Sequence, residues 1–473
     1  MAKEIELKLR VRQADFKLLE AQMQQLKAQP QGAKRLENTY FDTPDLQLNQ
    51  ARAALRLRFN TQGWVQTLKT SGATLGALSE RGEWEMPVPE GKLNLALFPE
   101  GLIKPDWQNQ LTPQFSTNFT RQTWVYKDTT STPPAIIEIA ADQGEASLPI
   151  KKEQATSSAD TFSELELELK QGEPTSLFKL ANHLAANLVV HLGVLSKAER
   201  GLRLLKGSHF VRPTPRPLIN QPSVSFTDLT NLAIQEVNQW LLAHENWAFN
   251  ANEDEMLYAH RALLRLHALL VLAQRLCSQS KLNAAISAVK KLINSFLPWV
   301  ESCWQDKALQ GLALIGPDAE WRSINMNYAL RRSEYRRLWY KNWVGQASLL
   351  VIESLFKNQS LQACTQENKA DYLLQQAIAK LGLPLQPMQV EVWIERYPSL
   401  VRVELLLAAV KPKAKENLQR IKQMQQAIEV LSGYQQLLAK KNITESITKK
   451  IQQEEQLVLL HLGRLAQALW VDV

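Results

Sequence analysis

Two short stretches of alternating charged and aliphatic residues carry the side chains best suited to chemistry. The first is Glu4-Ile5-Glu6-Leu7-Lys8, and the second is the repeat that places Glu164, Glu166 and Glu168 in phase. Alternate residues of a β-strand point to one face, so each stretch predicts a strand with an apolar face and a charged face. Clustered carboxylates bind hard cations such as Mg²⁺ or Mn²⁺ through oxygen. For the first stretch alone, a solvated edge strand explains the charges equally well.

Basic residues follow the same alternation between these two stretches. Arg56 and Arg58 share one face of a predicted strand, and Lys69 lies on the charged face of the strand after the turn at Gly63. Arg121 lies in an aromatic and β-branched strand. Guanidinium and ammonium groups bind phosphate oxygens, and phosphoryl transfer depends mainly on charge neutralisation and positioning. Carboxylates and basic groups together therefore favour a polyanion that binds with a divalent metal.

At least seven predicted strands in the first 200 residues carry a charged face, most of them opposite an apolar face. Two helices are expected among them, at residues 15–26 and 176–191. An antiparallel sheet of eight strands can close into a barrel that holds a small ligand. We therefore expect an α+β protein with an eight-stranded closed β-barrel, charged inside and covered outside by helices. The alternative is a sheet whose charged faces meet water.

Composition and motifs exclude several other classes. No Walker loop, Gly-x-Gly-x-x-Gly, Gly-x-Ser-x-Gly or metal-spaced histidine pair is present. The net charge of +8 has no accompanying aromatic-basic motif, so nucleic-acid binding is not favoured. No uncharged run of membrane-spanning length and no signal peptide is visible. Three widely spaced cysteines suggest buried thiols, and we expect a soluble, cytoplasmic protein without a membrane partner.

The ordered set of charged motifs resembles the CYTH, or triphosphate tunnel metalloenzyme, superfamily. Glu4-Ile5-Glu6-Leu7-Lys8 matches its Glu-x-Glu-x-Lys signature, and Ser196-Lys197-x-x-Arg200-Gly201 lies near the end of the match at about residue 205. The chain is most similar to the bacterial branch that joins a CYTH domain to a CHAD domain and hydrolyses inorganic triphosphate. The resemblance implies domains at residues 1–205 and 226–473, joined by a proline-rich linker at residues 206–225.

The resemblance also implies roles for individual residues. Glu4 and Glu6, with two of Glu164, Glu166 and Glu168, would bind Mg²⁺ or Mn²⁺, and Asp142 would assist. Lys8 would contact phosphate or help to orient or deprotonate the attacking water, and Arg81 and Glu83 would form a second layer. The residues that would bind the substrate phosphates are Arg56, Arg58, Lys69, Arg121, Lys197 and Arg200. For each basic residue, a salt bridge within the cavity wall is the competing interpretation.

Helical apolar spacing dominates from residue 229 onward, so an all-α bundle is expected there. Its position resembles a CHAD domain, a helical module that binds polyphosphate. In the corresponding helix only Arg261 and Arg265 keep the expected basic places, and Tyr258 stands where a histidine is expected. We therefore expect a scaffold or docking role more than retained binding of longer polyphosphate. His260 and His267 are expected to be packed or surface residues.

The main hypothesis is a metal-dependent inorganic triphosphatase. One alternative is a protein that binds polyphosphate without turnover. Another is a related tunnel enzyme that acts on thiamine triphosphate or nucleoside triphosphates, including an adenylate cyclase. The sequence leaves open the metal, the substrate chain length, and which two of the three glutamates bind metal.

Overall fold

The computed structural model of the chain contains two compact units. One comprises residues 1–213 and 341–353, and the other comprises residues 214–340 and 354–473. The structure describes residues 2–60, 63–70, 74–75, 77–149, 159–207, 223–250, 252–312, 333, 337–359, 370–383, 389–440, 443 and 445–469. Within these ranges, the side chains of residues 2–4, 60, 74 and 81 are not described.

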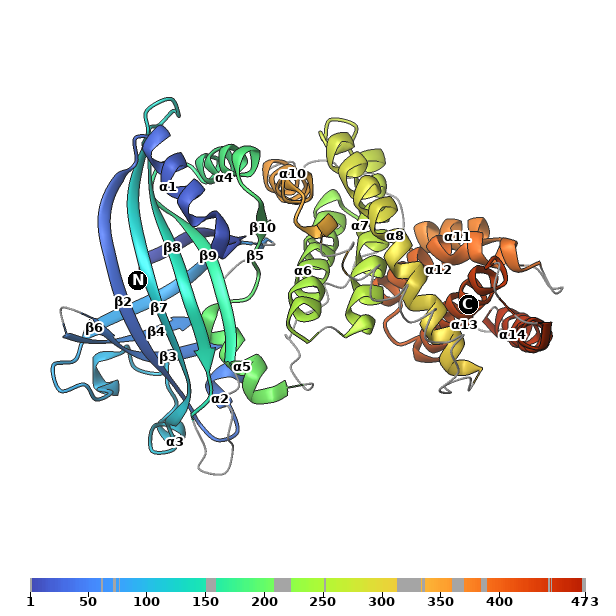
Figure 1. Cartoon of the computed structure of the whole chain (residues 1–473), viewed down its shortest axis with the longest axis horizontal. Coiled ribbons are helices and arrows are strands. Elements are labelled where there is room, and N and C mark those ends of the chain that lie inside the picture. The colour runs from blue at the N-terminus through green and yellow to red at the C-terminus, as the bar shows by residue number, and fades with distance from the viewer. Residues whose placement is uncertain are drawn as a thin grey trace. The chain divides into compact units, whose positions relative to one another are not determined.

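The described part of the first unit forms one antiparallel sheet of ten strands (Figure 1). In chain order the strands are β1 (Ala2–Val11), β2 (Gln29–Asp42), β3 (Ala53–Asn60), β4 (Gly63–Thr70), β5 (Thr74–Leu75), β6 (Leu78–Pro87), β7 (Thr112–Asp128), β8 (Ala135–Ser147), β9 (Ala159–Gln171) and β10 (Val190–Leu192). Their order in the sheet is β10-β1-β9-β8-β7-β2-β3-β4-β6-β5, and β1 also pairs with β6. The predicted eight-stranded closed barrel is therefore not confirmed in that form. The short strands β5 and β10 add to β6 and β1 and raise the count to ten.

The apolar core of the sheet lies on the face opposite the charged residues. Leu7 and Leu9 of β1 and Leu165 and Leu167 of β9 are fully buried there. The helix α4 (Thr175–Asn187) packs on these two strands and buries its own apolar side chains, and α1 (Phe16–Gln25) carries buried Leu19 and Met23 (Figure 1). This arrangement explains why the strands alternate strictly, because each places an apolar side chain outward and a charged side chain inward.

The segment between β6 and β7 covers the outer face of β3 and β4. Phe98 and Ile103 pack with Leu55 and Leu68 in a buried cluster. The segment contains only the short helices η2 (Leu95–Leu97) and α3 (Pro105–Gln108). Residues 87–111, which have no periodicity in the sequence, thus form a lid over the apolar side of the sheet.

Local boundaries differ from the predicted ones in two places. The predicted helix at residues 176–191 ends at Asn187, and Val190–Leu192 then forms β10 against the end of β1. β2 begins at Gln29, although Pro30 to Gly32 were expected only to end the preceding helix. A register shift between Pro30 and Gly32 accommodates both residues in the pairing of β2 with β7.

The helix α5 (Lys197–Lys206) closes one side of the sheet near β7, β8 and β9. Ser196 and Glu199 form a reciprocal capping box that fixes its first turn. A Cβ atom at Gly201 would lie 2.0 Å from the ring of Phe115, so only glycine allows this close approach. The N-terminal end of α5 is thereby held against the charged face.

The helix α10 (Asn342–Asn358) belongs in part to the first unit, although it lies far along the chain. Asn182 Nδ2 of α4 donates a hydrogen bond to Glu353 Oε2 at 2.9 Å, and Gln346 Nε2 donates to the carbonyl oxygen of Ala185 at 3.2 Å. The Cα of Gly345 faces β10, where a Cβ atom would lie 1.9 Å from the carbonyl oxygen of Val190. Figure 1 shows α10 beside α4. Residues 341–353 therefore complete the unit that contains the sheet.

The described part of the second unit is helical. Its helices are α6 (Phe226–Asn250), α7 (Glu253–Leu276), α8 (Asn283–Gly311), α11 (Ala370–Leu381), α12 (Val390–Val410), α13 (Lys415–Leu438) and α14 (Glu445–Leu469). α7 is long and apolar enough to span a membrane by length and composition, but 67% of its apolar window is buried, as in a core helix.

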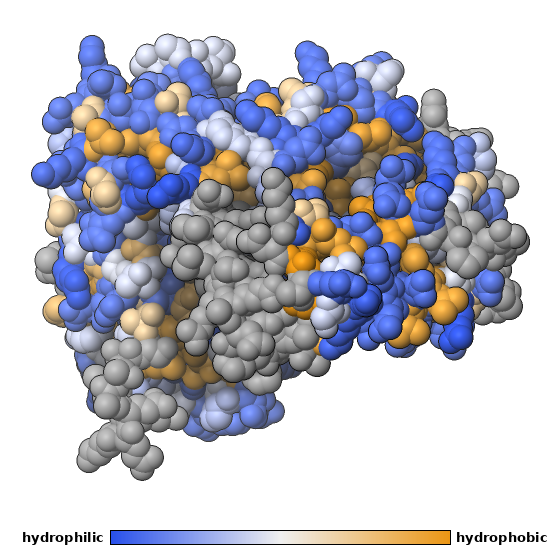
Figure 2. Space-filling view, turned by 45° about the vertical axis from the view of Figure 1, so that its right-hand side comes forward, coloured by the Kyte–Doolittle hydropathy of each residue, from blue (hydrophilic) through white to orange (hydrophobic). Residues whose placement is uncertain are grey.

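Cys303 is a buried thiol as predicted, whereas Cys277 is disulfide-bonded, so the prediction of three thiols is wrong. One face of the molecule is mostly hydrophilic (Figure 2).

The close approach of α10 to β10 predicts opposite effects for one substitution at two helical glycines. Gly345→Ala should destabilise the full chain by about 1–3 kcal/mol, because the new methyl group meets a backbone oxygen that cannot rotate away. Gly463→Ala, in α14, has nothing within 4 Å and should be neutral or stabilising by about 0.5–1 kcal/mol. Urea unfolding, with hydrogen exchange read in β10, measures both. Equal effects of the two variants would contradict the packing of α10 on β10.

Candidate functional site

The charged face of the sheet lines a cavity of about 640 Å³. Seven basic and six acidic side chains line it among the described residues, and they are Lys8, Arg56, Arg58, Lys69, Arg121, Lys170, Lys197, Glu6, Glu83, Glu85, Glu138, Glu166 and Glu168. The cavity is large enough for a small ligand. Its lining distinguishes it from the mostly apolar pockets that bind organic molecules.

Three of the basic residues face the main group of carboxylates. Arg56, Arg58 and Lys69 lie on β3 and β4 and are here called the basic wall, whereas four of the six acidic residues lie on the neighbouring strands β1, β9 and β8. β3 is four strand pairings away from β9 in either direction around the sheet, through β8, β7 and β2 or through β1, β6 and β4. The basic wall therefore lies across the cavity from Glu166 and Glu168, which are paired with the remaining basic residues Lys8, Arg121, Lys170 and Lys197.

The register of β1, β9 and β8 sorts the carboxylates into two groups. Glu168 pairs with Glu6 on one side and with Glu138 on the other, and these three residues, here called the acidic row, all line the cavity. Ser79 Oγ donates to Glu6 Oε1 at 3.1 Å, and Lys170 Nζ lies 2.6 Å from Glu168 Oε1. Like charges directly opposite one another are destabilising, so the acidic row favours a bound cation.

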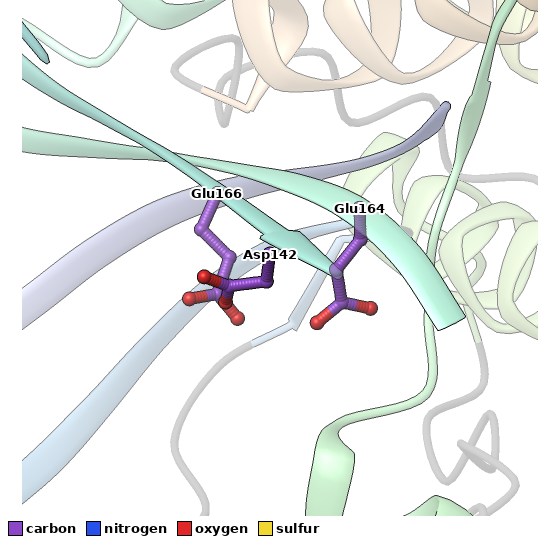
Figure 3. A group of neighbouring side chains, drawn as sticks. All are labelled: Asp142, Glu164 and Glu166. Atoms are coloured by element: carbon purple, nitrogen blue, oxygen red, sulfur yellow. The ribbon is translucent and has the colours of Figure 1, made fainter. Parts of the chain in front are cut away.

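The second group is the carboxylate triad of Asp142, Glu164 and Glu166. Figure 3 shows the three side chains extending from β8 and β9 to the same side, and one oxygen of each lies within 4.8 Å of the others. Asp142 and Glu164 are fully buried, whereas Glu166 lines the cavity. Glu164 Oε2 is buried and has no hydrogen-bond partner among the described residues. Oxygen donors at this spacing could hold a hard divalent cation.

Four basic residues surround the triad in this structure. Lys197 Nζ lies 2.6 Å from Glu164 Oε1, 2.7 Å from Asp142 Oδ2 and 2.8 Å from Glu166 Oε1. Arg121 donates to both oxygens of Asp142 and to Glu166 at 2.5–2.7 Å. Lys8 Nζ lies 3.3 Å from Glu166, and Arg200 NH2 lies 3.9 Å from Glu164. The negative charge of the triad is therefore balanced by protein groups.

This network shifts the pKa values of its members. Burial alone would raise the pKa of Glu166, but Lys197, Lys8 and Arg121 hold it well below its usual range. Burial alone would lower the pKa of Lys8, but Glu164, Glu166 and Glu6 raise it above its usual value. Both groups are consequently charged at neutral pH.

The basic wall is only partly neutralised. Lys69 Nζ lies 3.3 Å from Glu83, and Arg56 NH2 lies 3.7 Å from Glu83 and 3.8 Å from Glu85. Tyr40 lies beside Arg56; burial alone would raise the pKa of its hydroxyl, but Arg56 lowers it below its usual value. Glu83 and Glu85 thus position two cations without covering them, because all four side chains still line the cavity.

Arg58 differs from the other cations. Its Nε donates to Asn38 Oδ1 at 3.0 Å, and within the described ranges no carboxylate lies at ion-pair distance from it. Burial, followed by the charges of Arg56 and Arg121, lowers the pKa of Arg58 to about 10. A guanidinium group that is destabilised by burial and by like charges gains most from an anionic ligand.

The structure brings most of the predicted site residues together. Glu6, Lys8, Arg56, Arg58, Lys69, Arg121, Glu166, Glu168 and Lys197 line one cavity, while Asp142, Glu164 and Arg200 lie behind its wall. The side chains of Glu4 and Arg81 lie outside the described part of the structure; their backbones pair between β1 and β6. Glu138 also lines the cavity. No ligand role was predicted for it, although Glu138 and Asp142 alternate onto the same face of one predicted strand.

The two arginines that fit the CHAD pattern are engaged inside the helical unit. Arg261 donates to Glu429 Oε1 at 2.5 Å and to the hydroxyl of Tyr397 at 3.1 Å. Arg265 donates to Glu236 Oε2 at 2.8 Å and lies 3.8 Å from Glu404. His260, expected to be either packed or at the surface, is buried, and burial followed by the nearby charge of Arg261 lowers its pKa to about 4. Both arginines of α7 are therefore paired inside the helical unit, as expected for a core helix.

Comparison with known proteins gives matches to the first part of the chain. Residues 2–202 match the family model described as the CYTH domain. An inorganic triphosphatase of Haemophilus influenzae is 33% identical over 171 residues, which are 36% of this chain and 46% of that protein. The chain therefore matches about half the length of that relative. The match supports the resemblance for the CYTH part, and the CHAD part stays a prediction.

Among solved structures, a proposed adenylyl cyclase from Hippeastrum, described as having dominant triphosphatase activity, has 19% identity and a TM-score of 0.31. The match covers 44% of this chain and 98% of the Hippeastrum chain. A proposed adenylate cyclase from Bacillus halodurans has 24% identity and a TM-score of 0.27. This match covers 42% of this chain and 98% of the Bacillus chain.

The network around the triad predicts a pH-dependent stability effect. Arg121→Met removes a partner of buried Asp142 and of Glu166 and should destabilise the chain by about 3–5 kcal/mol at pH 7. Because the folded pKa of Glu166 is depressed, this contribution is fully present above the usual value of 4.5, begins to fall below it, and is lost as pH falls through the folded pKa. The defect should therefore shrink in urea unfolding at pH 4.

Arg35→Met provides the control for this prediction. Arg35 lies on neighbouring β2, with its side chain 62% exposed and 3.8 Å from Glu37. Its loss should cost less than about 1 kcal/mol at either pH. An Arg121→Met defect as small as that of Arg35→Met at pH 7 would contradict the network.

Proposed function

We propose that residues 2–202, which match the CYTH domain family, hydrolyse inorganic triphosphate to pyrophosphate and phosphate with the help of Mg²⁺ or Mn²⁺. The observation that carries the proposal is the cavity in which carboxylates of β1, β8 and β9 face Arg56, Arg58 and Lys69, and in which Arg58 has no carboxylate partner among the described residues. An anion with several phosphate groups would supply the missing negative charge on the basic wall. A divalent cation would match the carboxylates opposite.

The acidic row and Glu166 are the proposed metal ligands that face the cavity. The oxygen-only donor set suits Mg²⁺ or Mn²⁺. The bound cation would neutralise phosphate charge next to the reacting phosphorus. Glu166 and Glu168 are the two glutamates of the repeat that reach a metal in the cavity, whereas Glu164 lies behind the wall and could hold a metal only within the triad. Glu4 remains a proposed ligand from the motif alone.

The basic residues have separate proposed tasks. Arg56, Arg58 and Lys69 would bind the phosphate chain on the wall opposite the carboxylates. Water attacks the terminal phosphorus, the bond to the bridging oxygen breaks, and pyrophosphate leaves with the bonding electron pair. Since Lys8 is an ammonium group at neutral pH, it suits contact with a phosphate oxygen better than removal of a proton from water.

The helical unit is proposed to have a structural role. Arg261 and Arg265, the two basic residues in the expected CHAD places, are paired with buried glutamates and cannot bind a polyanion without breaking those pairs. Breaking a buried ion pair is costly. Binding of longer polyphosphate at α7 is therefore not part of the proposal.

A phosphate-release assay on the full chain with Mg²⁺ or Mn²⁺ tests the proposed reaction. Tripolyphosphate should be hydrolysed faster than longer polyphosphates, ATP or thiamine triphosphate. Glu6→Gln should lower kcat/KM by at least about 100-fold, because it removes a charged ligand of the metal that neutralises the reacting phosphate. Glu37→Gln, on the exposed part of β2, should leave the rate unchanged.

Two outcomes would contradict the proposal. Absence of phosphate release by the wild-type chain with either metal would favour binding without turnover, provided that tripolyphosphate still binds. Faster turnover of ATP, with cyclic AMP as the product, would favour a cyclase that uses the same cavity.

A further inference from the structure

Lys197 is placed between the carboxylate triad and the cavity. Its ammonium group lies within 2.8 Å of an oxygen of all three triad residues, and its side chain also lines the cavity. The same nitrogen can therefore contact the triad behind it or an anion in front of it. A lysine suits such an exchange, since it carries a compact charge on a flexible stem.

The position of α5 does not depend on this contact. Arg203 NH2 lies 2.5 Å from Asp160, and Arg200 NH1 lies 3.5 Å from the same carboxylate. Gly201 fits against the ring of Phe115. Lys197 is the first residue of the helix, so its side chain can turn while these contacts hold the helix in place.

Charge balance makes Lys197 the group that a metal would displace. Lys8, Arg121, Lys197 and Arg200 each contact the triad, which contains three carboxylates. Arg200 is also held by Asp160. Adding a divalent cation without releasing a basic group would leave excess positive charge where Asp142 and Glu164 are fully buried, which is costly. Arg121 is held in a two-point contact with Asp142, and Lys8 lies farther away at 3.3–3.8 Å.

The donor set that Lys197 occupies also suits a metal. The triad offers only oxygen atoms, and Glu164 Oε2 is buried without a hydrogen-bond partner among the described residues. This oxygen lies 3.9 Å from Arg200 NH2, beyond hydrogen-bond distance, so a hard cation could supply the close contact that it lacks.

We propose that Lys197 is an internal counter-ion that competes with a divalent cation for Asp142, Glu164 and Glu166, and that its ammonium group turns to a substrate phosphate when the cation takes the triad. The inference rests on the proposed function only where it names a phosphate as the group to which Lys197 turns. Competition with the metal follows from the contacts of Lys197. Lys197 is on this account a positioning residue that couples metal binding to phosphate binding.

Calorimetric titration of the full chain with Mn²⁺, in the absence of any phosphate, tests the competition. Lys197→Met removes the competing charge and should tighten Mn²⁺ binding at least tenfold. Lys69→Met removes a cavity lysine that pairs with Glu83 and not with the triad, and it should change Mn²⁺ affinity less than twofold. Lys197→Arg keeps the charge and should not tighten binding.

Unchanged or weaker Mn²⁺ binding by Lys197→Met would overturn the proposal. If that variant does not fold, as judged by urea unfolding, Lys197→Gln replaces it with the same expected and contradicting results. The failure of the proposed function is a separate result, because a wild-type chain that releases no phosphate can still show tighter Mn²⁺ binding on loss of Lys197.

Discussion

Burial of charge on the inner face of the sheet is the constraint on which the rest of the first unit depends. Leu7 and Leu9 of β1 are fully buried on the outer face, while Glu6 and Lys8, which alternate with them, are only 6% and 5% exposed. A strand buried on both faces is normally apolar throughout, because unpaired buried charges are unfavourable. The sheet resolves this conflict by pairing charges across strands and with α5, whose Lys197, Arg200 and Arg203 meet the acidic residues of β8 and β9.

Neutralisation by protein groups is uneven, and the unevenness indicates function. The triad contacts four basic residues, whereas Arg58 on the opposite wall has only an amide partner among the described residues, and the three carboxylates of the acidic row lie side by side with Lys170 next to Glu168 and Glu138. A purely structural network gains nothing from such gaps. A cavity for a metal and a phosphate chain requires them, since the ligands supply the missing charges. The outer helices and the segment at residues 87–111 act indirectly, because they cover the apolar faces and so keep the charged faces inward.

Local alternation was enough to predict which side chains face the cavity. Glu6, Lys8, Arg56 and Glu166 lie where their phase in the strands placed them, because a β-strand has a period of two wherever it lies. Contacts between distant segments were not predictable in this way. The register of β9 against β1 and β8 decides that Glu168 joins the acidic row while Glu164 joins the triad. The insertion of residues 341–353 into the first unit depends on a close fit at Gly345, and the internal pairing of Arg261 and Arg265 depends on glutamates of other helices.

The most direct test of the account is a crystal structure of the full chain with Mn²⁺ and a non-hydrolysable triphosphate analogue, with the metal located by anomalous scattering. The account predicts a manganese peak among carboxylates of β1, β8 and β9, with Glu6 or Glu166 among the ligands. It also predicts phosphate oxygens in contact with Arg56 and Arg58 on the opposite wall. A manganese peak away from these carboxylates, or an analogue bound outside the cavity, would contradict it.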